Sequence, residues 1–368
     1  MKEISLTIFN LLSILSLFGA ALFAFQLYFL KERNTSTKYF SFYLLSISVI
    51  VAFFLIVELE FQKIAVGAIP IFMFALLSLG PILWLTVNST VGGKKNKIIK
   101  HLFIPIVSSI VFVLLLGVAL LLKDVPSGEF VQDVLTYVTI ITLTLVFVLQ
   151  SGYYIYQSLK LYKKHLIRVE EVFSYTERVN LHWLKLFVYG YIVFILGLVV
   201  SNLLDDVWSD IFFYTVLFGY IIFSGYNALR YEPVFKADDE ITEKETKVEV
   251  DVKNEFFTKL KSELIAAMET QKLYLDEALT IHSLATKLDT NSKYLSQLIN
   301  TEFKKSFVVF VNEYRVNEAK LLLKDEKNKN LTIEGIGYEA GFKSKSAFNS
   351  AFKKFTGDTP SSFLKKEI

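Results

Sequence analysis

Seven long apolar segments fill the first 230 residues of the chain, and they constrain its fold more than any other feature. A helix needs about 20 apolar residues to cross a hydrocarbon core about 30 Å thick, and each segment reaches or approaches that length. Apolar residues make up 53% of the sequence, as expected of a chain that is partly embedded in lipid. We therefore expect membrane-spanning helices at residues 8–30, 39–57, 66–90, 102–122, 131–159, 183–204 and 207–229.

The loops between these segments differ in positive charge. Twelve Lys and Arg residues lie in one alternating set of loops, and three lie in the other set. Because cytoplasmic loops carry the excess of Lys and Arg, the N-terminus is expected outside the cell membrane. Seven spans then place Arg230, and everything that follows it, in the cytoplasm.

The seven segments contain almost no ionisable side chains, which ion-coupled transporters and intramembrane enzymes place near mid-membrane. The remaining polar side chains are interpreted as interhelical hydrogen-bonding groups rather than as a ligand site. They include Gln26, Asn88, Gln150 and Asn202. Because the loops expected outside are short, a sensed signal would be small, lipid-like or carried by a partner membrane protein.

No pattern of catalytic, cofactor-binding or metal-ligating residues is recognisable. The sequence has no cysteine, which excludes thiolate metal sites and cysteine nucleophiles. The four histidines have neither ligand spacing nor a nucleophile partner; they are His101, His165, His182 and His282. We expect no enzymatic activity, no cofactor and no metal site.

The longest loop on the side expected to be cytoplasmic comprises residues 160–182. Leu166, Val169, Val172 and Phe173 fall at helical spacing in it, which predicts an amphipathic helix lying on the membrane surface. Two interpretations stay open. The helix is a lever that couples the spans to the cytoplasmic domain, or it simply rests on anionic headgroups.

An acidic connector is expected at residues 231–252, because eight acids outnumber four bases between residues 236 and 255. Such a composition is typical of a solvated linker. A connecting helix at residues 253–275 should follow. Its apolar face consists of Phe257, Leu260, Leu264 and Met268. That face is expected to pack against the next domain or, alternatively, to form a short dimer seam.

The C-terminal quarter of the sequence contains an internal repeat. Residues 279–285 (LTIHSLA) parallel residues 331–337 (LTIEGIG), and each copy has a threonine suited to cap an amphipathic helix. A turn and a second helix follow, which opens at Asn291 in the first copy and at Ser344 in the second. Gly341 supplies the left-handed residue that ends the preceding helix. Each copy therefore predicts a helix-turn-helix.

The last hundred residues or so resemble the AraC/XylS-type transcriptional regulators. Residues 341–360 (GFKSKSAFNSAFKKFTGDTP) look like the signature of that family, and residues 310–316 (FVNEYRV) look like the start of its linking helix. Gly337 stands where alanine is usual, which is expected to loosen its helix, and Leu364-Lys365 replace an aromatic-arginine pair. The multi-span N-terminal half resembles a membrane-bound bacterial subset of the family, which implies the bacterial inner membrane.

The expected fold is all-α, with a seven-helix transmembrane bundle at residues 1–230 and a cytoplasmic double helix-turn-helix domain at residues 276–368. The linker at 231–252 and the connecting helix at 253–275 join them, and an apolar-periodic helix at about 307–323 links the two helix-turn-helix units.

The second helix of each unit is expected to enter a major groove, where base edges can be distinguished. Candidate base contacts are Ser292, Lys293, Ser296 and Gln297 in the first unit, and Lys345, Ser346, Asn349 and Ser350 in the second. Candidate phosphate contacts are Lys304, Lys305, Arg315, Lys353 and Lys354. Lys293 and Lys345 are equally well explained as phosphate-contacting or solvated residues. Arg315 is equally well explained as a structural tether of the linking helix.

These features together predict a membrane-bound, one-component transcription regulator with the bundle as its sensor. Its expected partners are double-stranded DNA, the lipid bilayer, a second copy of the chain in a homodimer, and a small or lipid-like ligand or partner membrane protein. The alternatives are a membrane-anchored interaction protein and a transporter with a regulatory DNA-binding tail.

Overall fold

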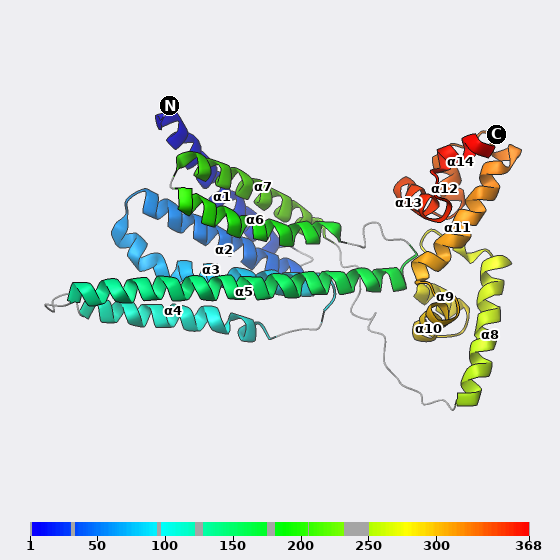
Figure 1. Cartoon of the computed structure of the whole chain (residues 1–368), viewed down its shortest axis with the longest axis horizontal. Coiled ribbons are helices and arrows are strands. Elements are labelled where there is room, and N and C mark those ends of the chain that lie inside the picture. The colour runs from blue at the N-terminus through cyan, green and yellow to red at the C-terminus, as the bar shows by residue number, and fades with distance from the viewer. Residues whose placement is uncertain are drawn as a thin grey trace. The chain divides into compact units, whose positions relative to one another are not determined.

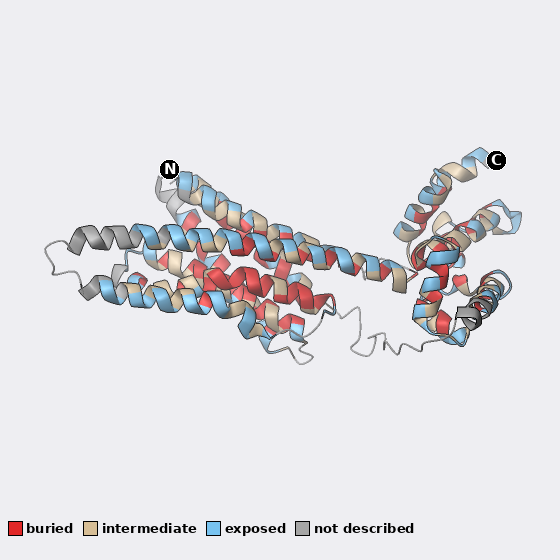
Figure 2. Cartoon of the chain, turned by 60° about the horizontal axis from the view of Figure 1, so that its bottom comes forward, coloured by how far each residue is buried: buried red, intermediate tan, exposed pale blue. Residues whose placement is uncertain are grey.

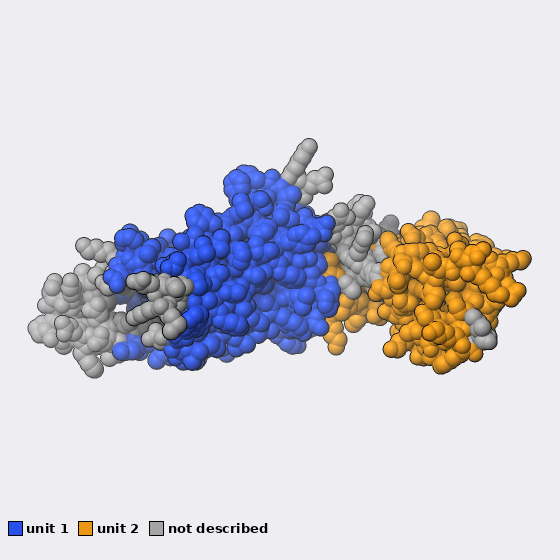
Figure 3. Space-filling model, turned by 90° about the horizontal axis from the view of Figure 1, so that it is seen from above, with its two compact units in different colours: residues 1–162, 182–236 blue, residues 163–181, 237–368 orange. Residues whose placement is uncertain are grey.

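The computed structural model describes all residues except 1, 31–33, 94–96, 122–127, 175–180, 205, 232–249 and 368. Over the residues described, the fold is all-α and contains no strand, as the sequence predicts. The chain divides into two compact units (Figure 3). The first comprises residues 1–162 and 182–236, and the second comprises residues 163–181 and 237–368. Most of the predicted acidic linker lies outside the described residues.

The first unit is built from seven long apolar helices (Figure 1). They are α1 (Lys2–Tyr28), α2 (Thr35–Glu58), α3 (Gln62–Thr90), α4 (Ile98–Leu121), α5 (Gly128–Val172), α6 (His182–Leu204) and α7 (Val207–Leu229). Each is long and apolar enough to cross a membrane. The prediction of seven such helices is confirmed, one for each apolar segment of the sequence.

The inner and outer helices of this unit differ in burial (Figure 2). Half of the most apolar stretch of α3 is buried against other helices, whereas only 6% of that of α4 is. The exposed side chains of the outer helices are large and apolar, such as Ile99, Leu114 and Leu149. A surface of this kind is stable in hydrocarbon and unstable in water, because exposed apolar area is unfavourable only in water.

Hydroxyl groups make hydrogen bonds that cross between the described helices of this unit. Tyr43 and Tyr220 join α2 to α7 through their hydroxyls at 2.9 Å, and Ser151 and Tyr191 join α5 to α6 at 2.9 Å. The amide of Gln150, which the sequence suggested for this role, has no hydrogen-bond partner among the described residues.

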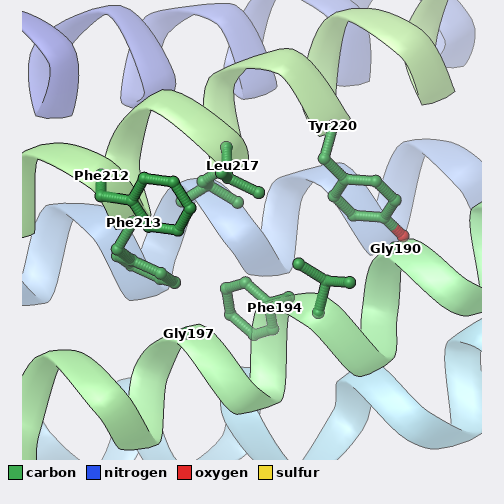
Figure 4. A pocket seen from close by; sticks show the side chains of 9 residues that line it. Gly190, Phe194, Gly197, Phe212, Phe213, Leu217 and Tyr220 are labelled. Atoms are coloured by element: carbon green, nitrogen blue, oxygen red, sulfur yellow. The ribbon is translucent and has the colours of Figure 1, made fainter. Parts of the chain in front are cut away.

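An apolar groove lies between α6 and α7 (Figure 4). Gly190 and Gly197 of α6 face the rings of Tyr220 and Phe213 of α7, and Phe194 completes the wall between them. Tyr220 is the one lining residue with a polar side-chain atom, and its hydroxyl donates to the carbonyl of Phe187 at 3.1 Å. The groove therefore offers an apolar surface with no unsatisfied hydroxyl.

The two glycines allow α6 and α7 to approach this closely. A Cβ atom at residue 190 would lie 2.3 Å from Cε2 of Tyr220, whose ring is fixed by its hydrogen bonds. We expect Gly190→Ala to destabilise the detergent-solubilised protein by about 1–3 kcal/mol, because a tightly packed core does not absorb an added methyl group.

The matched control is Gly152→Ala on α5, where nothing lies within 4 Å of the added Cβ. That variant should be neutral or slightly stabilised, since alanine is the better helix former. Thermal unfolding in the same detergent compares the two. Equal melting temperatures for both variants would contradict the close packing of α6 on α7.

The second unit consists of short helices around two separate apolar cores. Its elements are α8 (Val250–Glu269), the 3-10 turn η2 (Leu273–Leu275), α9 (Ile281–Lys287), α10 (Ser292–Glu302), α11 (Phe307–Lys324), the 3-10 turn η3 (Glu326–Asn328), α12 (Ile333–Glu339), α13 (Lys345–Thr356) and α14 (Pro360–Glu367). The predicted pair of two-helix units joined by a linking helix is confirmed as α9–α10, α11 and α12–α13.

The linking helix α11 belongs to both cores. Its N-terminal half buries Phe307 and Phe310 against α8, α9 and α10, and its C-terminal half buries Val316 and Ala319 against α12 and α13. Helix α8 buries Leu264 and its apolar neighbours in the first core, so its apolar face packs within the domain, as one of the two interpretations held.

The region after the fifth span differs from the prediction. It does not form a separate surface helix, because α5 continues without a break to Val172. No glycine, proline or capping residue interrupts the helical pattern after Ser158, so the apolar and charged side chains simply extend the helix. Residues 163–181 belong to the second compact unit.

Candidate nucleic-acid interface

Side-chain caps fix the start of all four helices of the two repeats. The side chains of Thr280, Asn291, Thr332 and Ser344 each accept a hydrogen bond from a backbone N–H three residues on, at 2.9–3.1 Å. Each cap satisfies one of the N–H groups that a helix start leaves without a partner. The four caps expected from the repeat are therefore confirmed.

The turn between the two helices needs a left-handed residue in each copy. Gly341 has φ +88°, and Asp289 has φ 48° in the first copy. At Gly341 the backbone also approaches another segment, since an added Cβ would lie 2.5 Å from the carbonyl oxygen of Tyr274 and 2.8 Å from Cα of Leu275. The second helix-turn-helix therefore rests directly on the backbone of η2.

Close packing explains why position 337 is a glycine, which the sequence alone does not reveal. A Cβ at this residue would lie 2.7 Å from Cδ1 of Phe348. The absence of a side chain lets α12 and α13 approach closely over the Phe348 ring, which is fully buried. The glycine therefore allows close helix packing, which offsets any cost in helix propensity.

Helix α10 separates a buried face from a face open to solvent. Leu295, Leu298 and Ile299 are buried in the first core. The predicted base contacts lie on the other side, with Lys293 and Gln297 exposed and Ser292 and Ser296 half-buried. The α10 face thus presents two long polar side chains with a serine beside each.

Helix α13 has the same arrangement. Phe348, Ala351 and Phe352 are buried in the second core. Among the predicted base contacts, Lys345, Ser346 and Ser350 are exposed and Asn349 is half-buried. The structure thus brings each set of four candidates together on one solvent-facing helix surface.

A polar contact lies at the start of each of α10 and α13. Ser292 hydrogen-bonds Nδ1 of His282 at 2.8 Å in the first unit, and Lys345 lies 3.4 Å from the carboxylate of Glu334 in the second. His282 and Glu334 occupy the same position in the two copies of the repeat. The sequence reasoning missed both residues, although alignment of the copies was the signal that could have found them.

The predicted phosphate contacts differ in their surroundings. Lys304 is exposed just after α10, and Lys353 and Lys354 are exposed in the last turn of α13, where the helix dipole favours a cation. Lys305 is half-buried and forms an ion pair with Glu313. Three of the lysines are thus open to an anionic partner. Lys305 would bind a phosphate only by sharing its ammonium group between that phosphate and Glu313.

Arg315 is not placed for phosphate contact, which corrects that assignment in favour of the structural tether. Its side chain is 1% exposed. Nε donates to the carbonyl of Tyr274 at 2.8 Å, Nη2 donates to the carbonyl of Asp276 at 2.8 Å, and both Nη atoms donate to Ser174 at 3.0–3.1 Å. Burial lowers the pKa of Arg315 to about 10, against the opposing effect of Asp276 and Glu277, so it stays charged at neutral pH.

The η2 turn that receives Arg315 is held in place by a second polar cluster. Glu318 of α11 accepts hydrogen bonds from Lys272 at 2.8 Å and from the Tyr274 hydroxyl at 2.8 Å. Burial acts to raise the pKa of Glu318, but the two hydrogen bonds outweigh it and keep that pKa below its ordinary value. The carboxylate is therefore ionised at neutral pH and anchors the turn to the linking helix.

Comparison with known proteins identifies this part of the chain. Residues 284–366 match the helix-turn-helix domain family. The chain is 30% identical over 90 residues to the melibiose operon regulatory protein of Escherichia coli, a match that covers 24% of the chain and 29% of that protein. The C-terminal region is an AraC/XylS-type helix-turn-helix domain.

A second relative of this helix-turn-helix domain is the Msm operon regulatory protein of Streptococcus mutans, 29% identical over 89 residues, which are 24% of the chain and 31% of that protein. The chain spans less than a third of the length of these curated relatives. No solved structure is significantly similar to the chain. The relatives therefore inform the domain alone, and the first unit must be interpreted from its own residues.

Gly341 offers a test of how the second helix-turn-helix rests on η2. Gly341→Ala should lower the stability of the full-length protein by more than Gly357→Ala does, although both residues have positive φ. Gly357→Ala should cost only the strain of a left-handed backbone, about 1–2 kcal/mol. It adds no clash, because nothing lies within 4 Å of its added Cβ. Gly341→Ala should add about 1–3 kcal/mol of overpacking against Tyr274 and Leu275.

The measurement is thermal unfolding of the helix-turn-helix domain within the purified full-length protein, with both variants in the same buffer. If the two variants lost the same stability, the close backbone approach at Gly341 would be refuted.

Proposed function

We propose that the protein is a membrane-bound, one-component transcription regulator that binds specific sequences of double-stranded DNA. The observation that carries this proposal is the presence, in one chain, of seven membrane-length helices and an AraC/XylS-type helix-turn-helix domain. Both relatives are named as regulators of operons, which supports the proposal.

In the proposed complex, α10 and α13 enter successive major grooves. Gln297 and Asn349 have amide groups that can pair with adenine, and Lys293 and Lys345 can reach guanine acceptors or a phosphate. The serines Ser292, Ser296, Ser346 and Ser350 complete the base-contacting faces. Lys304, Lys305, Lys353 and Lys354 contact phosphates and position the domain without reading sequence.

In the proposed topology, the first 230 residues form a transmembrane bundle of the bacterial inner membrane, and the helix-turn-helix domain lies in the cytoplasm. The excess of Lys and Arg in alternate loops supports this orientation. The domain itself carries an excess of three positive charges over residues 276–368, which favours moderate affinity and binding as a homodimer.

The proposed signal is a small lipid-like molecule that reaches the bundle from within the bilayer. The apolar groove between α6 and α7 supports this choice, since its walls are glycine backbone, aliphatic side chains and aromatic rings. The alternative signal is a partner membrane protein that packs against the same helices.

The first experiment locates the DNA that the protein occupies in cells. Cells carrying the full-length protein with a C-terminal tag are crosslinked, and the DNA that copurifies is sequenced. Discrete genomic sites next to promoters are expected. The matched control is the double variant Gln297→Ala/Asn349→Ala, which retains every buried residue of α10 and α13 and should lose those sites.

Two results would contradict the proposal. If a protein present in the membrane enriched no DNA under any growth condition, a membrane-anchored interaction protein would be favoured instead. If the double variant kept the same sites, α10 and α13 would not be the reading helices.

Single substitutions should separate base contacts from phosphate contacts. Gln297→Ala should cost about 1–3 kcal/mol at one base position and relax specificity there, whereas Lys353→Ala should weaken binding to all sequences alike. Lys353→Ala should also reduce the slope of log affinity against log salt by about one. Fluorescence anisotropy with an operator and its single-base variants, at several salt concentrations, measures both effects. A uniform loss of affinity in Gln297→Ala would overturn its assigned role.

A further inference from the structure

The end of α5 is built into the helix-turn-helix domain. Val172, the last residue of α5, packs against the first core of that domain, and Phe173 pairs with Thr280 in an antiparallel bridge. Ser174 donates to the carbonyl of Leu279 twice, from its N–H at 3.2 Å and from its hydroxyl at 2.6 Å. These three residues and their partners all lie within the second compact unit (Figure 3).

Arg315 holds Ser174 from the other side. Nη1 donates to the Ser174 carbonyl at 3.1 Å and Nη2 donates to the Ser174 hydroxyl at 3.0 Å. Ser174 is 1% exposed, so water does not substitute for these bonds. A buried cation that loses two acceptors is strongly destabilised, even though Nε and Nη2 keep their bonds to the carbonyls of Tyr274 and Asp276. The charge of Arg315 therefore favours a bound Ser174.

The contact is made at residues 274–280, a segment that both helix-turn-helix units touch. Leu279 and Thr280 directly precede α9, and Thr280 is its N-cap. The Tyr274 carbonyl that Arg315 also binds is the atom on which Gly341 of the second unit rests. A change in this segment therefore affects both units at once. The segment contains none of the residues proposed to contact bases.

We propose that residues 172–174 are a latch that docks the end of α5 onto Leu279, Thr280 and Arg315, and that seating or release of the latch sets the DNA affinity of the domain. This regulation rests on the proposed function. Helix α5 is a single helix from Gly128 to Val172, and its residues 131–159 are a predicted span. A shift of that span therefore acts on the latch through one continuous helix.

The latch is a second connection, distinct from the covalent one. The acidic segment at 231–252 is predicted from its composition to be a solvated linker, and most of it lies outside the described residues. By contrast, the latch joins the two helix-turn-helix units to α5 through buried, directional bonds. It is the route by which a small movement of a helix changes the arrangement of the recognition helices.

A disulfide can lock the latch, because the chain has no cysteine of its own. The pair Phe173→Cys/Thr280→Cys replaces two residues that face each other across the antiparallel bridge. Opposed residues of such a pair have Cβ atoms about 4.5–5.5 Å apart, close to the spacing that a disulfide spans. The full-length variant is placed in membrane vesicles, oxidised, and compared with its reduced form and with each single-cysteine variant.

A second variant opens the latch. Ser174→Ala removes the hydroxyl that bonds both Leu279 and Arg315, and leaves one N–H of the buried guanidinium without an acceptor. It should shift the latch about tenfold toward release. The matched control is Ser262→Ala on the exposed surface of α8, whose hydroxyl bonds only within its own helix.

The two variants should change operator affinity in opposite directions. Using an operator fragment recovered from the crosslinked cells, we expect the oxidised pair and Ser174→Ala each to differ from the unaltered protein by at least about threefold, with opposite signs. Ser262→Ala should bind like the unaltered protein, and each single-cysteine variant measures the effect of its own substitution at the latch. The reduced pair reports whether the two substitutions by themselves affect folding.

Each way of failing has a different meaning. If the disulfide did not form in folded protein, the latch would be absent and the proposal would be overturned, while DNA binding by the unaltered protein would still support the proposed function. If the disulfide formed and affinity did not change, the contact would be structural and the regulatory proposal would fall. Absence of operator binding in every form would instead refute the proposed function itself.

Discussion

The buried charge of Arg315 is the interaction on which the second unit depends. A guanidinium held away from water is stable only if its donors find acceptors, and here the acceptors come from η2, from the turn after it and from residue 174. Residue 174, residues 274–276 and α11 are distant from one another in sequence, and they must therefore meet at one side chain. The packing of the second helix-turn-helix follows from the same point, because Gly341 rests on the Tyr274 carbonyl that Arg315 fixes.

One helix and one repeated plan account for the rest of this unit. Helix α11 supplies the two halves of its length to two different cores, so neither recognition helix can shift without a change at α11. The two copies of the repeat have the same architecture but different polar side chains. Where the first unit has a hydrogen bond between His282 and Ser292 at the start of α10, the second has a Glu334–Lys345 ion pair at the start of α13, so the two units present different surfaces.

The features that sequence reasoning predicted are those set by local interactions. The seven apolar helices follow from length and composition, and the caps at Thr280, Asn291, Thr332 and Ser344 follow from residues within one turn of each helix start. The features that it missed depend on contacts far along the chain. Ser174 lies 141 residues from Arg315, and the need for glycine at position 337 comes from a ring on the next helix. Neither partner can be identified from its own neighbours in sequence.

A signal can change DNA binding only by the free energy with which it distinguishes two states of the protein. A hydrogen bond to a buried charged group contributes about 1.5–3 kcal/mol, which is the size of the coupling that allosteric proteins commonly show. The proposed latch is also close, along the chain, to the helix that a ligand would displace. Seven residues separate Ser174 from the start of α6 at His182, and α6 forms one wall of the apolar groove. A lipid-like molecule of the kind proposed would displace α6, which begins shortly after the latch in sequence, while a shift of α5 would act on the helix that ends in the latch. Because both neighbours of the latch are predicted spans, the latch is where movements within the bilayer would converge on the DNA-binding domain.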